Sequence, residues 1–186
     1  MHDTATWLAP ARSGDEGARA ALFGRHRGRL LAFLRVHMDG PLARAADPED
    51  VLQETLLLAA RRLAAFEDRG PGSFYRWLVG IAKLKASEAD RARHALKRSV
   101  VGPLEGDPEG RATGPAERAE RAERAERLRR ALAALPEDQG RAVGLRYLEG
   151  CSVAEAAERL GRSEAAVKAL VSRGLDGLAA RLDESA

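Results

Sequence analysis

Apolar residues recur every three or four positions along most of this chain, which is the spacing of an α-helix with one buried face. The clearest case is residues 47–66, where the apolar positions on one face are Val51, Leu52, Leu56, Ala59, Leu63 and Phe66. Similar spacing gives the core positions Leu22, Phe23, Leu30, Leu31 and Leu34 in residues 14–38, and Phe74, Trp77, Leu78 and Ile81 farther on. The pattern predicts an all-α protein of about seven helices.

Helix-start signals precede several of these segments. Small polar residues are favoured there because their side chains accept hydrogen bonds from the unpaired amides of the first turn. Proline is favoured because it has no amide hydrogen that needs a partner. The predicted starts are two capping boxes, an Asp-Pro cap, a serine N-cap and a proline at the first helical position: Ser13 with Glu16, Ser152 with Glu155, Asp47-Pro48, Ser73 and Pro136.

Residues 99–115 interrupt the helical pattern with four glycines and three prolines, a composition typical of a flexible linker. We therefore predict two small helical domains, residues 10–98 and residues 116–186. The second domain starts with four copies of Ala-Glu-Arg over residues 116–127. Glu and Arg four positions apart stabilise a helix by about 0.2–0.5 kcal/mol per pair, and we interpret this segment as a solvated charged helix.

Composition supports helices and excludes several classes of protein. Aromatic residues make up only 4% of the chain, while Ala, Leu, Arg and Glu dominate, which disfavours a β-sandwich. Cys151 is the single cysteine, so neither an intrachain disulfide nor a cysteine zinc site is expected, and no metal or other cofactor is predicted. Residues 1–10 lack the features of a signal peptide, and no run of about 18 apolar residues occurs. These features predict a cytoplasmic protein without membrane insertion.

Charge is distributed unevenly, although the net charge is only +3. Residues 41–68 hold three basic and six acidic side chains, whereas residues 76–98 hold seven basic and two acidic ones. An acidic surface thus precedes a basic one, and the basic one suits a nucleic-acid backbone.

The segment SVAEAAERLGRSEAAVKALVSRG, residues 152–174, meets the steric demands of a helix-turn-helix. Ala157 allows the two helices to cross closely, Gly161 supplies the turn, and Val167 and Leu170 pin the second helix on the first. The outward or flanking positions, suited to phosphates or base edges in a major groove, are Arg162, Ser163, Glu164, Lys168, Ser172 and Arg173. A helical hairpin without a ligand produces the same pattern. From residue 136 onward acids outnumber bases nine to seven, so weak DNA affinity is expected from this half alone.

Residues 128–178 are similar to region 4 of extracytoplasmic-function (ECF) sigma factors. The resemblance is carried by Leu135-Pro136-Glu137, LRYLEG at residues 145–150, Leu160-Gly161 and Ala166-Val167-Lys168. It implies that this domain contacts the minus-35 promoter element through the outward residues just named. Leu170 departs from the family, in which many members carry arginine there.

One face of the predicted helix over residues 47–66 carries Asp50, Gln53, Glu54 and Leu57. An acidic helix face of this kind is usually solvated surface, and no histidine or apolar pocket suggests catalysis or a metal. The ED-x-x-QE frame, however, resembles region 2.2 of the same sigma family. That resemblance implies that the four residues bind core RNA polymerase.

The next segment, GPGSFYRWLVGIAKLKASEADRARHALKRS, places basic side chains beyond its apolar face, and Tyr75 is the aromatic residue expected to face outward. Arg76, Lys83, Lys85, Arg91 and Arg93 are predicted to form a groove for the backbone of a separated DNA strand. The pattern GSFxxWLxxIA is similar to regions 2.3 and 2.4 of the family. It implies that the loop from Glu67 to Ser73, with Lys83, Leu84 and Lys85, surrounds flipped bases of the minus-10 element. Leu84 stands where asparagine is frequent.

The resemblance covers residues 14–98 and 128–182 and identifies the chain as a short, two-domain sigma factor. The expected partners are core RNA polymerase and promoter DNA, and an anti-sigma factor is a further candidate; no small-molecule substrate and no enzymatic activity are expected. The alternative is a helix-turn-helix regulator that never joins polymerase, in which the acidic face has no purpose. A helical enzyme is disfavoured because no catalytic triad, phosphate loop or metal cluster is found.

Overall fold

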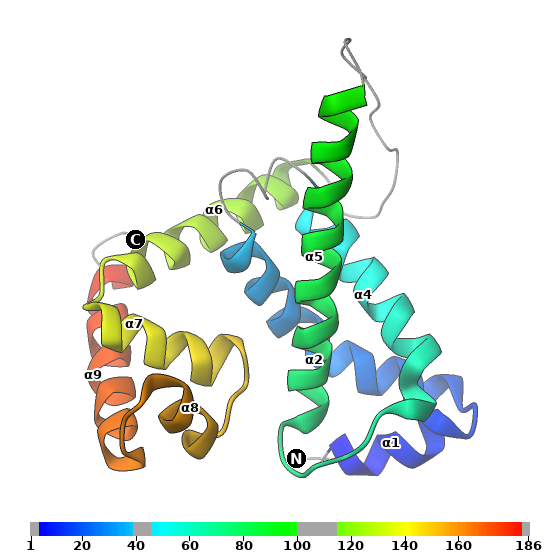
Figure 1. Ribbon diagram of the computed structural model, residues 1–186, viewed down its shortest axis with the longest axis horizontal. Helices are drawn as coiled ribbons and strands as arrows, with labels where there is room; N and C mark the ends of the chain where they lie inside the picture. The colour runs from blue at the N-terminus through cyan, green and yellow to red at the C-terminus, as the bar shows by residue number, and fades with distance from the viewer. Residues whose placement is uncertain (1–3, 39–45, 100–114, 184–186) are drawn as a thin grey trace.

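The computed structural model describes residues 4–38, 46–99 and 115–183, and every regular element in them is helical (Figure 1). This confirms the predicted all-α fold. In chain order the elements are α1 (Thr4–Arg12), α2 (Glu16–His37), α4 (Pro48–Arg62), the 3-10 turn η1 (Leu63–Ala65), α5 (Ser73–Ser99), α6 (Pro115–Ala133), α7 (Glu137–Val143), the π-helical turn η2 (Gly144–Leu148), α8 (Val153–Leu160) and α9 (Glu164–Asp183). Most of the predicted linker, residues 100–114, lies outside the described residues.

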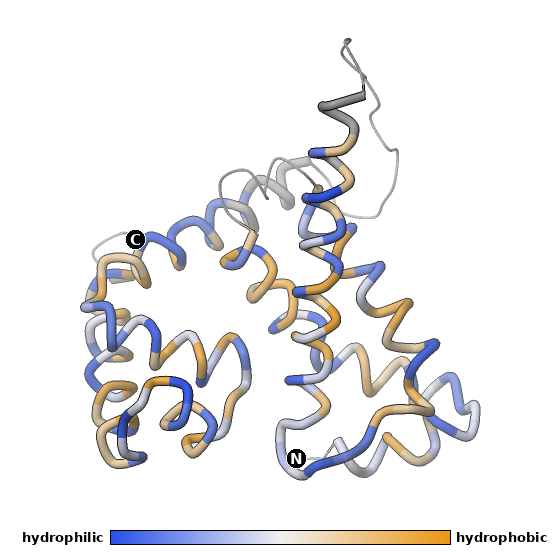
Figure 2. Tube along the Cα trace, viewed as in Figure 1, coloured by the Kyte–Doolittle hydropathy of each residue, from blue (hydrophilic) through white to orange (hydrophobic). Residues whose placement is uncertain are grey.

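Two separate hydrophobic cores organise the helices. The first joins α1, α2, α4 and α5, and the second joins α8 and α9 to η2 (Figure 1). Along each helix apolar and polar colours alternate in Figure 2, as expected where one face is buried. The predicted core positions are confirmed: all those of residues 14–38, 47–66 and 73–81 are buried or packed against the first core. We call the two groups the N-terminal module (α1 to α5) and the C-terminal module (α6 to α9).

Two predicted helix starts are confirmed in atomic detail. Asp47 caps α4 by accepting a hydrogen bond from the amide of Glu49 at 2.8 Å, and Pro48 is the first helical residue. Ser152 and Glu155 form the reciprocal capping box of α8, with bonds of 3.1 and 2.6 Å.

Three other predicted starts were wrong or displaced. Asp15, not Ser13, caps α2, because its carboxylate accepts a hydrogen bond from the amide of Ala18. The Ser13 hydroxyl instead donates to a carbonyl of α1. Helix α1 itself was not predicted from the sequence. The Ser73 hydroxyl donates to Asp68 at 2.7 Å and accepts from the amide of Arg69, so it holds the preceding loop instead of capping α5. Pro136 occupies the N-cap of α7, one position before the predicted one.

The helix-turn-helix forms with Gly161 at the turn, in the left-handed region at φ +61°. Val167 is fully buried against Ala157, as predicted. Leu170 is only half-buried, and Val171 packs on the core in its place. Positions three and four after Val167 both lie near its face of the helix, so helical periodicity alone does not distinguish Leu170 from Val171.

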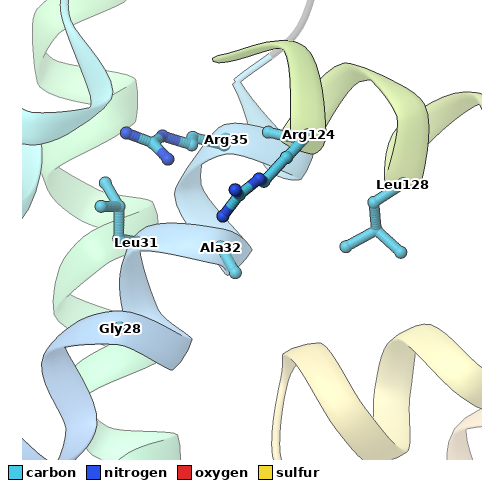
Figure 3. Close-up of a pocket in the computed structure, with 7 residues that line it drawn as sticks. Gly28, Leu31, Ala32, Arg35, Arg124 and Leu128 are labelled. Atoms are coloured by element: carbon cyan, nitrogen blue, oxygen red, sulfur yellow. The ribbon is translucent and has the colours of Figure 1, made fainter. Parts of the chain in front are cut away.

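One side of α6 lies over α2, so the Ala-Glu-Arg helix is not solvated all round. Between them is a cavity of about 250 Å³, lined on the α2 side by Gly28, Ala32 and Arg35 and on the α6 side by Arg124 and Leu128 (Figure 3). The predicted repeat pairing is seen at Glu120 and Arg124, whose side chains form an ion pair.

We expect His26 to make the protein sensitive to mild acid. Burial against the rings of Phe74 and Tyr75, with help from Arg25 and Arg29, lowers the pKa of His26 from 6.5 to about 4. The unfolded chain therefore binds a proton on this histidine between pH 6.5 and about 4 that the folded chain does not, so the free energy of unfolding falls as the pH falls through this window.

Urea unfolding at about pH 7 and about pH 5 measures this loss of stability. His26→Asn should flatten the pH dependence, whereas His94→Asn, at a side chain 61% exposed, should leave it unchanged. Equal slopes for His26→Asn and the wild type would contradict the assignment.

Candidate functional surfaces

The four residues of the predicted acidic face lie together on the outside of α4. Asp50, Gln53 and Glu54 are exposed, and the Leu57 side chain is 55% exposed despite being apolar. The opposite side of the helix is buried in the first core, which fixes the orientation of this face. We call these four residues the acidic strip.

The basic side chains of α5 do not form one continuous groove as predicted. Arg76 and Lys83 point toward the C-terminal module, whereas Lys85 lies beside the acidic strip, with its amine 3.6 Å from Glu54 and 2.9 Å from Glu88. The hydrogen bond that Lys85 donates to Glu88 raises the pKa of Lys85. Positions 83 and 85 point apart because successive helical residues turn by about 100°.

The remaining predicted positions on α5 are more dispersed. Arg91 is exposed and donates to the carbonyl of Ser87 at 3.3 Å, and the side chain of Arg93 lies outside the described residues. Leu84 is 40% exposed.

The loop between η1 and α5 borders a surface cavity of about 570 Å³. Phe66 and Trp77, whose rings are 5.1 Å apart, form its aromatic part, and Arg69 and Arg76 contribute guanidinium groups. The loop is shaped by Asp68, which accepts from the Ser73 hydroxyl and from the amide of Gly70, a residue at φ +94°. The predicted loop therefore borders a cavity lined by aromatic, cationic and acidic side chains, the acidic ones being Glu67 and Glu155. Lys83, Leu84 and Lys85, which were predicted to surround the same bases, do not line it.

The predicted minus-35 positions are all exposed on or just before α9: Arg162, Ser163, Glu164, Lys168, Ser172 and Arg173. Two of them also have structural roles. Arg162 forms an ion pair with Asp138 at 2.9 Å, and the Ser163 hydroxyl accepts from the amide of Ala166 in the first turn of α9. The N-terminal half of α9 thus presents a polar surface of the size that enters a major groove.

Tyr75, expected to face outward, is only 1% exposed. It belongs to the first core, where its ring packs on His26, and its hydroxyl donates to the carbonyl of Leu148 in η2 at 2.7 Å, so the expectation was wrong. This burial raises the pKa of Tyr75 to about 12. The contact between the modules was not predicted, because helical periodicity does not show which exposed helix faces pack against each other.

Comparisons with known proteins match both halves of the chain. The family described as Sigma-70 region 2 matches residues 22–95, and Sigma-70, region 4 matches residues 125–176. The ECF RNA polymerase sigma factor SigF of Caulobacter vibrioides is 33% identical over 154 residues, which are 83% of this chain and 79% of SigF. The chain belongs to the ECF RNA polymerase sigma factors.

Two further proteins agree with this assignment. The ECF RNA polymerase sigma factor BldN of Streptomyces coelicolor is 30% identical over 177 residues, 95% of this sigma factor but only 64% of BldN. The solved structure of CnrH in complex with the cytosolic domain of CnrY has the same fold, with a TM-score of 0.51, 26% identity and 97% coverage of both chains. As a member of the family, this sigma factor binds RNA polymerase and recognises promoters.

The matched regions contain the candidate surfaces of this sigma factor. The acidic strip, the loop cavity and α5 up to residue 95 fall in region 2, and the helix-turn-helix falls in region 4. Within residues 4–38, 46–99 and 115–183, no helix is long and apolar enough to cross a membrane, and no group of three or more metal-binding side chains occurs.

Two arginine side chains that link distant parts of the chain, those of Arg12 and Arg29, were not predicted from the sequence. Arg12 of α1 donates to the carbonyls of Leu63 and Phe66 and so fixes the start of the loop beside the cavity. Arg29 of α2 donates to carbonyls of η2. An arginine on the polar face of a helix looks solvated in a sequence, and no periodic signal marks these two.

Ser73→Ala should loosen the loop that borders the cavity. It removes the bonds to Asp68 and to the amide of Arg69, and we expect the free energy of unfolding to fall by about 1 kcal/mol. Urea unfolding measures the loss, and amide hydrogen exchange should be faster in residues 67–72. Ser87→Ala, at an exposed position of the same helix, is the control. Unchanged exchange in the loop would show that Ser73 does not hold it.

Proposed function

We propose that this sigma factor binds core RNA polymerase through the acidic strip. The strip combines three polar or acidic side chains with Leu57, and an exposed apolar residue among charges is typical of a protein-binding surface. The buried side of α4 holds this helix rigidly, so little conformational entropy is lost when the strip binds a partner. The ion pair of Glu54 with Lys85, at 3.6 Å and on the surface, is weak, so it can be replaced by a contact with the polymerase.

The loop cavity is the proposed site for a flipped base of the minus-10 element. This proposal rests on one observation: the half-buried Trp77, packed on the buried Phe66, lines the cavity next to the guanidinium groups of Arg69 and Arg76. Unstacking a base costs a few kcal/mol, and stacking on aromatic surface with nearby cations offsets that cost. Lys83 continues the cationic surface along α5, and the backbone of the strand extends toward the predicted contacts at Lys85, Arg91 and Arg93.

The helix-turn-helix is proposed to hold the minus-35 element as duplex. The exposed start of α9 enters the major groove, with Arg162, Lys168 and Arg173 available to phosphates or guanine edges. In this assignment residues 10–98 and 116–186 are the two domains and residues 99–115 link them. The protein performs no covalent chemistry and acts in the cytoplasm. Because CnrH was solved in complex with another protein, the cytosolic domain of CnrY, a protein partner of this chain, such as an anti-sigma factor, is also proposed.

Run-off transcription with purified core polymerase tests the function as a whole. We expect specific initiation on native promoters when the sigma factor is added, and none with core polymerase alone. Absence of specific transcripts on every native promoter offered, with folded protein, would instead favour a regulator that acts without joining polymerase.

Reversing the charge of the acidic strip tests the polymerase interface. Asp50→Arg with Glu54→Arg should weaken binding to core polymerase by at least about tenfold, because complementary charges are replaced by repulsive ones. Pull-down and fluorescence anisotropy with purified core measure the change. Glu137→Arg with Glu158→Arg, an equal change of charge in the C-terminal module, should bind as the wild type does. If the strip variant also binds like the wild type, the interface lies elsewhere.

A further inference from the structure

The cavity between α2 and α6 has mainly hydrocarbon walls (Figure 3). Leu31 and Ala32 form the wall on α2 together with the backbone of Gly28, and Ala125 and Leu128 form the wall on α6. The volume of the cavity is about 250 Å³. An engineered apolar cavity of about 150 Å³ in another protein holds benzene, so this one is large enough for a small organic molecule. We call it the interhelix cavity.

Two guanidinium groups also border the interhelix cavity, one from each helix. They belong to Arg35 of α2 and Arg124 of α6, and Figure 3 shows the Arg124 side chain extending from α6 toward α2. No acidic side chain is among the described residues that line the cavity. A guanidinium group presents a planar fork of N–H donors that matches the two oxygens of a carboxylate. Hydrocarbon walls with guanidinium groups suit a ligand that is apolar at one end and anionic at the other.

The carboxylates near these arginines do not exclude an anionic ligand. Arg35 donates to Glu49 at 3.0 Å, and the same carboxylate lies 3.9 Å from Arg27, so this one negative charge does not neutralise both arginines. Arg124 pairs with Glu120, four positions earlier in α6, and both side chains are more than half exposed. An exposed pair of this kind contributes little to stability, so Arg124 can exchange Glu120 for a ligand.

Gly28 keeps the interhelix cavity open on the α2 side. It lies within α2 and is not among the glycines with positive φ, so the backbone does not require a glycine here. A Cβ at this position would meet no described atom within 4 Å. Glycine in the middle of a helix is less favourable than alanine, so the open space has a cost for the fold. A ligand that fills the space and contacts both helices offsets this cost by stabilising the folded chain.

We propose that the interhelix cavity is a binding site for a small monocarboxylate with a compact hydrocarbon body, the class to which aromatic acids belong. The carboxylate pairs with Arg124 and Arg35, and the hydrocarbon body lies over Gly28 between Ala32 and Leu128. Removal of the body from water and the charge-assisted hydrogen bonds both favour binding. The site shares no residue with the surfaces proposed for polymerase and DNA, so binding here is independent of the proposed function.

Benzoate is the probe for this site. Two-dimensional NMR spectra of the isotope-labelled full chain should show saturable shifts on addition of benzoate, concentrated in the amides of residues 28–35 and 124–128. Benzamide has the same ring without the charge, and inorganic phosphate has charge without the hydrocarbon body. Each should bind at least about tenfold more weakly than benzoate, because each lacks one of the two interactions.

Gly28→Leu should fill the site from the α2 side, and its Cβ meets no described atom that it would displace. Gly24→Leu is the matched control. Gly24 is exposed one turn earlier in α2, its Cβ would also meet nothing within 4 Å, and it does not line the cavity. Leucine favours a helix more than glycine does, so both variants should be at least as stable as the wild type. Benzoate binding should weaken at least about tenfold in Gly28→Leu and stay unchanged in Gly24→Leu.

Arg124→Gln tests the charged end of the site, because it removes the charge and keeps a similar helix propensity. Benzoate should bind about tenfold more weakly to this variant, whereas benzamide, which has no charge, should bind as it does to the wild type. Arg130→Gln is the control, since Arg130 also pairs with a glutamate of α6 but does not line the cavity. The two arginine variants decide the test if Gly28→Leu fails to fold.

Three results would overturn the site. Absence of saturable shifts with benzoate would show that the cavity binds no ligand of this class. Equal responses to benzoate, benzamide and phosphate would show that binding is not specific. If Gly28→Leu or Arg124→Gln binds benzoate as tightly as the wild type does, the ligand lies elsewhere, and shifts near Arg69 and Arg76 would then place it at the loop cavity. Run-off transcription tests the sigma function independently of all three results.

Discussion

Phe74, Leu78 and Ala82 of α5 are buried against α2 and α4, and the arrangement of the N-terminal module depends on this packing. Because a helix turns by about 100° per residue, burying these three positions determines where the others point. Arg76 and Lys83 are directed toward the C-terminal module, and Lys85 toward the acidic strip. One packed helix thus directs Arg76 and Lys83 to one side of the module and Lys85 to another.

Electrostatics connects the two modules as much as hydrophobic contact does. The C-terminal half is slightly acidic, which is unfavourable for a domain that binds DNA alone. Its acids have a structural use, however, because Glu149 and Glu155 pair with cations of α5. A weak intrinsic affinity for DNA and a tendency to dock on the other module have the same physical origin. If core polymerase binds the acidic strip as proposed, it offers the additional contacts that such a weak DNA-binding module requires.

Local signals were reliable where the interactions are local. The faces of α2, α4 and α5, the capping box at Ser152 and the turn at Gly161 depend on residues three or four positions apart, and all were predicted correctly. The errors arose where two local arrangements compete. Ser73 has the chemistry of an N-cap but bonds to Asp68 five positions earlier in the loop, and Val171, not its neighbour Leu170, packs on the second core. The resemblance to sigma regions 2 and 4, carried by short motifs, was confirmed by the comparisons.

The sequence by itself determined the all-helical fold, the residues of each buried face and the membership of the sigma family, because helical periodicity and motif spacing are written in neighbouring positions. Only the tertiary structure decided which exposed faces meet. Tyr75, which the sequence placed on the outside, is buried in the first core and its hydroxyl bonds to a carbonyl 73 residues away. The basic positions of α5 look equivalent in the sequence, but they lie on two surfaces. Arg76 and Lys83 pair with Glu155 and Glu149 of the C-terminal module, whereas Lys85 pairs with Glu54 of α4. Such contacts depend on the relative placement of whole helices, and no local pattern of residues encodes that placement.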